Sequence, residues 1–171
     1  MSVGYVGAIA EWFDFSLIAS VAKQNPAIHF HLFGSATTKE VRTIEGIANV
    51  TLYGEIHHSD VPAVISNMDV MIIPFRLLPI IQACDPIKFY EHCAMGKPTV
   101  ATRLPELERT ESLVFFASTP EECALQIDRA CDRGRDPKFR EELRLFAAAN
   151  TWTVRAAQYE QVLSQATRRS A

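Results

Sequence analysis

The sequence predicts an α/β fold, because short β-rich apolar runs alternate with segments whose apolar residues recur at helical spacing. The chain has 171 residues, of which 48% are apolar and 22% charged, so one domain is long enough to bury a core. After the last β-rich run the pattern is typical of helix only. We therefore expect one domain over residues 1–171, with a Rossmann-like, doubly wound parallel sheet of about six strands and a C-terminal helical tail over residues 119–171.

The expected strands are short runs rich in valine, isoleucine and phenylalanine, each separated from the next by a possible helical crossover. Right-handed crossovers place the ligand crevice of such a sheet beyond the carboxyl ends of its strands. The runs are Val3 to Val6, Ile28 to Phe33, Val50 to Tyr53, Val70 to Pro74, Thr99 to Thr102 and Leu113 to Ala117.

The expected helices have start signals. Asp14 suits the N-cap of the first, Asp60-Val61-Pro62 opens the second, and Asp85-Pro86 opens a third that ends at Gly96. Aspartate favours the N-cap, proline the first helical position, and glycine the left-handed residue after the last turn. The tail should form helices from Pro120 to Cys131, from Pro137 to Ala149, and from Trp152 to about Arg168.

The charge balance argues against a nucleic-acid partner. The chain has 17 Lys plus Arg against 20 Asp plus Glu, a formal net charge of -3, and its basic residues form no cluster along the sequence. A protein that binds nucleic acid without sequence preference needs a basic surface to contact the phosphate backbone. We therefore expect no nucleic-acid partner.

Signals for metal sites and membrane spans are also missing from the sequence. The longest apolar run, Val70 to Phe75, is far too short to span a bilayer. The cysteines form no C-x-x-C pair and have no zinc-site spacing with His57 and His58. We expect no metal site and a cytoplasmic chain with reduced thiols at Cys84, Cys93, Cys123 and Cys131.

The segment from Asp85 to Thr102 carries the clearest chemistry. A helix that starts after Asp85-Pro86 offers free N–H groups and about half a positive charge, which suits a diphosphate, and Lys88 adds a full charge beside it. Glu91 lies on nearly the same helix face, where its carboxylate can accept hydrogen bonds from ribose hydroxyls. Cation and carboxylate together indicate a nucleotide site. The alternative is an ordinary solvated Lys–Glu pair.

Gly7 follows the first strand, at the expected ligand edge of the sheet. A glycine there either lets a ligand approach the backbone closely or forms a plain tight turn. The spacing of Gly4, Gly7 and Ala10 does not match G-x-G-x-x-G, so we expect no nicotinamide or flavin cofactor. Aromatic residues in the same turn could line an acceptor cleft or cap the first helix against the sheet; they are Trp12, Phe13 and Phe15.

The whole segment from Asp85 to Thr102 resembles a known motif. Its Glu91, Gly96, Pro98 and final Val100-Ala101-Thr102 resemble the E-A-M-A-x-G-K-P-V-V-A-S segment in the donor-binding domain of GT-B glycosyltransferases, especially the family-4-like enzymes. The resemblance covers nearly the full chain. The G-x-V element of these enzymes is matched by Gly54-Glu55-Ile56, and their A-D-V-x-x-x-P segment resembles the helix and strand that follow, up to Pro74. The F-S-W opening of their last helix resembles Asn150-Thr151-Trp152.

The chain departs from the family pattern at three places. Ala83 stands where the family has a second glutamate, and Ala8 and Trp12 stand near the places of its two first-turn phosphate cations. The loop from Phe75 to Cys84 is longer than usual and leads to Asp85-Pro86-x-Lys88. This version resembles a polysaccharide-assembly subgroup with the pattern D-P-x-K-x-x-E-[YH].

The resemblance implies that a nucleoside-diphosphate sugar is the donor substrate. Glu91 would bind the ribose, Lys88 and Arg76 would replace the lost phosphate cations, and the backbone near Ile56 would hold the base. Lysine, arginine and the helix dipole would neutralise the leaving diphosphate, so no cofactor and no essential metal are expected, and no catalytic residue is assigned. The implied donor site consists of Gly7, Ile56, Arg76, Asp85, Lys88 and Glu91.

The resemblance further implies that the chain is the C-terminal, donor-binding half of a glycosyltransferase for glycan or polysaccharide assembly. A core strand at Val3 to Val6, almost at the start of the sequence, leads us to expect a fragment that transfers nothing by itself. The glycan or lipid-linked acceptor would be held by an absent N-terminal domain. The full-length enzyme would be cytoplasmic, with a peripheral position at the inner face of the membrane as a further option.

Two other functions stay open at this point. The chain is alternatively a non-catalytic nucleotide-binding or scaffolding module of GT-B type, or a receiver-like α/β interaction domain with no nucleotide site. The identity of the sugar, base and acceptor, and the choice between retention and inversion, do not follow from these residues.

The last expected helix has a broad apolar stripe with a period near 3.6 residues. This stripe is wider than the apolar surface that one helix needs to pack against its own domain. We therefore expect the fragment to self-associate through residues beyond Thr151. The stripe consists of Trp152, Ala156, Tyr159, Val162, Leu163 and Ala166.

Overall fold

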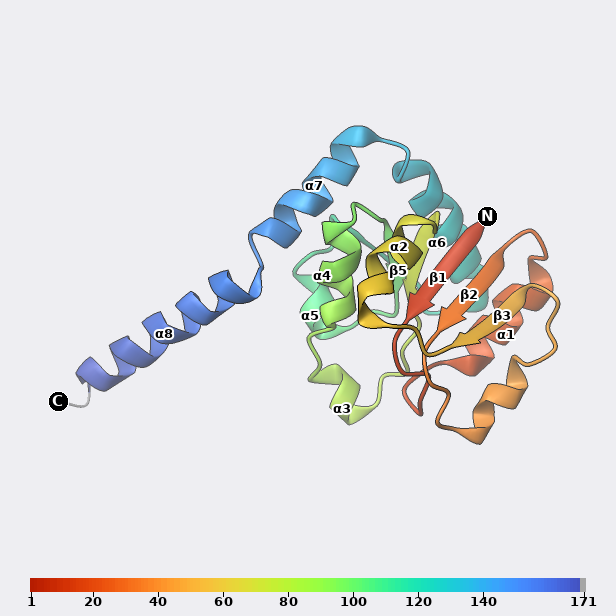
Figure 1. Cartoon of the computed structure of the whole chain (residues 1–171), viewed down its shortest axis with the longest axis horizontal. Coiled ribbons are helices and arrows are strands. Elements are labelled where there is room, and N and C mark those ends of the chain that lie inside the picture. Colours follow the sequence, from red (N-terminus) through yellow and green to blue (C-terminus); the bar gives the residue numbers. More distant parts are fainter. Residues whose placement is uncertain (170–171) are drawn as a thin grey trace.

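The computed structural model describes residues 1–169, with side chains up to residue 165, and it shows a parallel six-stranded sheet (Figure 1). The strand order is β3-β2-β1-β4-β5-β6. The chain therefore adds β2 and β3 on one side of β1, and then returns to add β4, β5 and β6 on its other side. The predicted doubly wound, Rossmann-like sheet is confirmed. The strands are β1 (Ser2–Val6), β2 (His29–Phe33), β3 (Val50–Gly54), β4 (Val70–Ile73), β5 (Thr99–Ala101) and β6 (Val114–Phe116).

Helices cover both faces of this sheet. Helices α1 (Phe15–Gln24) and α6 (Pro120–Arg133) pack against each other, α2 (Val61–Ser66) packs on β1, and α4 (Ile87–Ala94) lies between β4 and α7 (Pro137–Ala148). Helix α8 (Trp152–Arg169) extends away from the body of the molecule (Figure 1). The shorter helical segments are η1 (Lys39–Thr43), η2 (His58–Asp60), α3 (Pro79–Gln82) and α5 (Pro105–Glu108).

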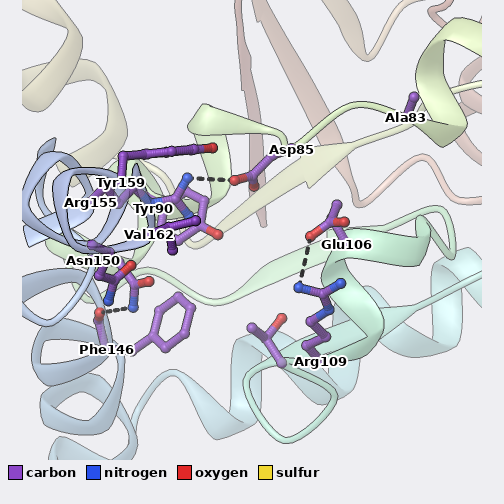
Figure 2. A pocket seen from close by; sticks show the side chains of 12 residues that line it. Ala83, Asp85, Tyr90, Glu106, Arg109, Phe146, Asn150, Arg155, Tyr159 and Val162 are labelled. Atoms are coloured by element: carbon purple, nitrogen blue, oxygen red, sulfur yellow. Dashed lines mark hydrogen bonds and ion pairs between the residues drawn. The ribbon is translucent and has the colours of Figure 1, made fainter. Parts of the chain in front are cut away.

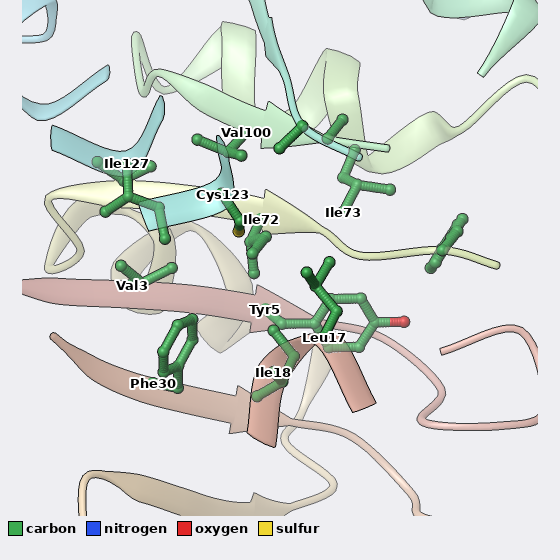
Figure 3. Packing of buried hydrophobic residues seen from close by; sticks show 14 of the residues in the cluster. Val3, Tyr5, Leu17, Ile18, Phe30, Ile72, Ile73, Val100, Cys123 and Ile127 are labelled. Atoms are coloured by element: carbon green, nitrogen blue, oxygen red, sulfur yellow. The ribbon is translucent and has the colours of Figure 1, made fainter. Parts of the chain in front are cut away.

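The main core lies between the sheet and the layer formed by α1 and α6 (Figure 3). Val3 and Tyr5 of β1 point into it together with Ile18 of α1 and Ile127 of α6, and all four are fully buried. Figure 3 shows these side chains meeting between the strands and the helices. Alternate residues of the central strand therefore anchor the helices that fix where its carboxyl end lies.

The predicted element boundaries agree closely with the structure. Each strand ends within one residue of its prediction, and the three tail helices begin at the predicted residues. Asp14 is the N-cap of α1, and its carboxylate accepts a hydrogen bond from the backbone N–H of Leu17 at 2.9 Å. Gly96 follows α4 with a φ of 62°, as expected for a left-handed residue after a helix.

One predicted cap is wrong. Pro86, not Asp85, occupies the N-cap of α4, and Ile87 is the first helical residue. The carboxylate of Asp85 instead forms an ion pair with Arg155 of α8, with 2.6 Å between Oδ2 and Nη1. A partner 70 residues away in the sequence has therefore replaced the local capping bond.

Candidate functional site

A crevice of about 500 Å³ lies beyond the carboxyl ends of β1 and β4, the two strands where the sheet reverses its direction of growth. Ligands of open α/β sheets bind at this switch point. Trp12 comes from the turn after β1, Phe75 follows β4, and the remaining walls come from α3, the start of α4 and the segment that joins these two helices. The complete lining is Trp12, Phe75, Ile80, Ile81, Cys84, Asp85, Pro86, Ile87 and Lys88.

The structure brings Lys88 and Gly7 together at this crevice. A Cβ atom placed on Gly7 would lie only 2.2 Å from Nζ of Lys88 and 2.7 Å from its Cε, and the φ of Gly7 is +142°. Only glycine combines this backbone conformation with the space that the lysine occupies. Gly7 therefore admits the ammonium group to the carboxyl end of the central strand.

Several contacts hold the backbone under this ammonium group. The N–H of Gly7 donates to the carbonyl of Phe33 at 2.8 Å, and the N–H of Gly34 donates to the carbonyl of Gly54 at 2.7 Å. A Cβ atom on Gly34 would lie 1.9 Å from the Gly7 carbonyl oxygen. The ends of β1, β2 and β3 thus pack backbone to backbone and form a hydrogen-bonded floor beside Lys88.

The amino group of Lys88 is poorly solvated. It lies 5.5 Å from the ring centroid of Tyr5, within the range of a cation–π contact. Burial lowers the pKa of Lys88, and the nearby Glu91 carboxylate opposes that shift. Within residues 1–169 its Nζ has no hydrogen bond or ion pair, so the group can accept an anionic partner from outside the chain.

Arg76 is placed differently from Lys88. Its guanidinium group pairs with both carboxylate oxygens of Glu40, at 2.5 and 3.2 Å, and also donates to the carbonyl of Glu11 at 3.3 Å. This pairing raises the pKa of Arg76 and lowers that of Glu40. The expectation that Arg76 helps to hold a phosphate therefore requires it to leave Glu40, whereas Lys88 is already free of such a partner in the described chain.

Asp85 connects the crevice to α8. Arg155 bonds to its Oδ2, and the guanidinium group of Arg155 also lies 4.4 Å from the ring centroid of Tyr90, which stacks on Phe146. Figure 2 shows this cluster at one side of a separate cavity of about 670 Å³, with the Glu106–Arg109 ion pair at the other. The largest of these cavities thus lies beside the crevice, between α5 and α8, and not at the switch point.

Glu91 and Ile56 do not line the crevice. Glu91 is partly buried and lines a smaller pocket of about 270 Å³ with residues of α4 and the start of α8. Ile56 is partly exposed in the loop after β3. Both lie on elements that end or begin at the ligand edge, but the predicted contacts with ribose and base stay predictions.

The sequence pattern did not predict the apolar walls of the crevice. Phe13 and Phe15 are buried in the core, as a cap on the helix requires, whereas Trp12 is only partly buried and lines the crevice. The walls contributed by Ile80 and Ile81 belong to α3, which was not predicted. Pro79 at its first position, within an apolar run, is the signal that could have indicated this helix.

Among the described residues, no three His, Cys, Asp or Glu side chains come together as a possible metal site. None of the helices within residues 1–169 is long and apolar enough to cross a membrane.

Comparisons with known proteins place the chain in a family. The sequence profile described as glycosyl transferases group 1 matches residues 2–133. TuaH of Bacillus subtilis (strain 168), named as a teichuronic acid biosynthesis glycosyltransferase, is 28% identical over 157 residues, which cover 88% of this chain and 40% of TuaH.

Solved structures show the same fold. HepE of Anabaena, determined in complex with UDP and glucose, has a TM-score of 0.69 at 18% identity over 95% of this chain. WaaG, a glycosyltransferase of lipopolysaccharide biosynthesis, has a TM-score of 0.57 at 14% identity over 85% of this chain. The chain spans 48% of the HepE chain and 43% of WaaG, so it corresponds to about half of either protein. Because the sequence profile matches residues 2–133, more than half of the chain, the chain belongs to the group 1 glycosyl transferases.

Proposed function

We propose that this chain supplies the donor site of a glycosyltransferase, in which a nucleoside-diphosphate sugar binds at the crevice beyond β1 and β4. The observation that carries the proposal is the position of Lys88, whose ammonium group lies over Gly7 without a partner in the described chain. The UDP and glucose in the HepE structure support a donor of this class. The name of TuaH supports a role in polysaccharide assembly.

The proposed chemistry is neutralisation of the leaving diphosphate. As the bond between the sugar and the diphosphate breaks, negative charge grows on the phosphate oxygens, and a cation already in place stabilises it without reorganisation. Lys88 is the second residue of α4, so the free N–H groups and the dipole of this helix start act in the same place. In this proposal these groups, and not a metal ion, hold the diphosphate.

The acceptor is proposed to be a glycan or a lipid-linked glycan, bound by a part of the protein outside this chain. This follows from the share of TuaH and HepE that the chain covers. The isolated chain is then expected to bind the donor weakly and to transfer no sugar.

The first test replaces Lys88 by methionine, which keeps the length of the side chain and removes its charge. A charge-assisted hydrogen bond contributes about 1.5–3 kcal/mol, so Lys88→Met should weaken binding of nucleoside diphosphates roughly 10- to 100-fold and binding of the bare nucleosides much less. Calorimetry with UDP, GDP and dTDP, each against its nucleoside, measures the difference. Lys23→Met, an exposed lysine in the last turn of α1, is the matched control. Equal losses for both ligand classes would show that Lys88 is structural.

The second test concerns Glu91 as the ribose ligand. If its carboxylate accepts the ribose hydroxyls, Glu91→Ala should weaken both nucleosides and nucleoside diphosphates, roughly 10- to 100-fold. Glu121→Ala, an exposed glutamate on α6, serves as the control. Unchanged affinities in a folded Glu91→Ala protein would remove Glu91 from the site and leave the proposal for Lys88 standing.

A second candidate function is a non-catalytic GT-B-like module that binds nucleotide or supports an assembly. Pairing of Arg76 with Glu40 favours it, since this pairing removes one of the two expected phosphate cations from the donor. Transfer assays on the full-length protein distinguish the two functions, because a module of this kind would bind nucleotide and consume no donor sugar.

A further inference from the structure

The crevice beside Lys88 has mostly apolar walls. Six of its nine lining residues are apolar: Trp12, Phe75, Ile80, Ile81, Pro86 and Ile87. Its volume of about 500 Å³ lies in the ordinary range of roughly 300–1,000 Å³ for small-molecule sites. The crevice is therefore large enough for a ligand and offers it chiefly van der Waals contact.

The polar groups in these walls have little to offer a sugar hydroxyl. Asp85 is the only carboxylate in the lining; its Oδ2 is held by Arg155, and its Oδ1, although unpaired in the described chain, is buried and so is not exposed to a ligand in the crevice. Cys84 is a weak hydrogen-bonding group. The remaining polar groups are Lys88, which the proposed function assigns to the diphosphate, and the indole N–H of Trp12, which interacts with the hydroxyl group of Tyr5.

The position of Lys88 decides which part of the donor meets the apolar walls. In a nucleoside-diphosphate sugar the sugar is bonded directly to the second phosphate. The nucleoside is bonded to the first phosphate, and its proposed ribose ligand Glu91 lies outside the crevice, in the neighbouring smaller pocket. With the diphosphate on Lys88 and the start of α4, this arrangement assigns the crevice to the sugar. Ile81, Phe75 and Trp12 line this space together with Lys88.

We propose that the crevice selects a donor whose sugar carries a methyl-bearing or deoxygenated position, such as an acetamido sugar or a deoxy sugar. This inference rests on the proposed donor-binding function. A hydroxyl group turned toward an apolar wall loses its water without gaining a partner, whereas a methyl group in the same place gains contact. The indole ring of Trp12 and the branched side chains of α3 supply that contact.

The test compares matched donors that differ at one position. UDP-N-acetylglucosamine is titrated against UDP-glucose, and GDP-rhamnose against GDP-mannose, each referred to the affinity of UDP or GDP alone. Because discrimination by one apolar group in a pocket reaches roughly 10- to 200-fold, we expect the methyl-bearing donor to bind at least about 10-fold more tightly in one pair or both. Equal or tighter binding of the fully hydroxylated sugars in both pairs would overturn the inference.

Substitutions in the wall locate the source of the preference. Ile80 is 73% exposed, so Ile80→Ser should leave the fold intact and reduce the preference roughly 3- to 10-fold. Ile81→Val removes one methylene group from the deeper wall and should act in the same direction. Leu125→Ser, at an exposed leucine of α6, is the control and should leave the ratio unchanged. A preference unaffected by both wall variants would overturn the assignment of these walls.

The outcomes separate this inference from the function on which it rests. Binding of UDP or GDP without any preference among sugars contradicts the sugar pocket only. Failure of every nucleotide to bind contradicts the donor site itself, and the inference with it.

Discussion

His92 is a buried titratable residue one helical turn beyond Lys88. It is 1% exposed; its Nδ1 lies 3.1 Å from the hydroxyl oxygen of Thr99, and its Nε2 has no partner in the described chain. Burial, and to a lesser extent the charge of Lys88, lowers the pKa of His92 to about 3. The imidazole is therefore neutral in the folded protein near pH 7.

A neutral buried histidine makes stability depend on pH in a definite direction. The unfolded chain takes up a proton near the ordinary pKa of 6.5, whereas the folded chain does so near 3, so the unfolded state binds more protons between these values and stability falls as the pH falls. Between pH 7 and pH 5, the free energy of unfolding of the wild-type chain should drop by about 2 kcal/mol more than that of the His92→Asn variant. Denaturant titrations at both pH values measure this, with His29→Asn at an exposed histidine as the control. Identical pH dependence in wild type and His92→Asn would contradict a neutral imidazole.

How far the sequence predicts a site residue depends on where its partner lies. Lys88 and Glu91 were identified because they sit in one contiguous motif at a helix start, and their helix forms as expected. The pairing of Arg76 with Glu40 joins residues 36 positions apart, and neither sequence neighbourhood indicates the other. The contact of Lys88 with Gly7 also depends on the packing of α4 against the sheet, so the sequence predicts both residues but not their approach.

The same distinction holds for whole elements. The strands and long helices were predictable because their apolar periodicity extends over several residues. Helix α3 has only four residues, Pro79–Gln82, too few to establish a period, yet it supplies two walls of the crevice. Helix α4 was predicted with the wrong cap, because Arg155 of α8 competes for Asp85 more successfully than the backbone N–H groups do.

The pairing of Arg155 with Asp85 should order the first turns of α8. Arg155→Met removes the ion pair and the contact with the ring of Tyr90, a loss of about 1 kcal/mol for a partly exposed pair. Amides between Trp152 and Tyr159 should then exchange roughly 5-fold faster with deuterium, while those of α6 keep their rates. Arg129→Met, at an exposed arginine of α6, is the control. Unchanged exchange in α8 would show that the helix is held by other contacts.

The whole molecule combines a well-packed sheet domain with a helix that leaves much of its apolar surface open. Trp152 is 70% exposed, Tyr159 73% and Val162 63%, although all three lie on the predicted apolar stripe. Ala166, also assigned to that stripe, lies outside the residues whose side chains are described. Figure 1 shows why the exposure is so high: α8 runs outward, away from the sheet and its covering helices.

An open stripe of this kind should cause the chain to associate with itself. Contiguous apolar patches above several hundred square ångströms are unusual on monomers, and covering this one against a second copy removes it from water. In sedimentation experiments the average mass should therefore rise with protein concentration. The double variant Trp152→Ser with Val162→Ser should weaken this rise, whereas Leu125→Ser, which removes an exposed leucine from α6, should not. A monomer at every concentration, with amides from Trp152 to Leu163 protected from exchange, would mean that α8 folds back and buries its apolar stripe against its own chain.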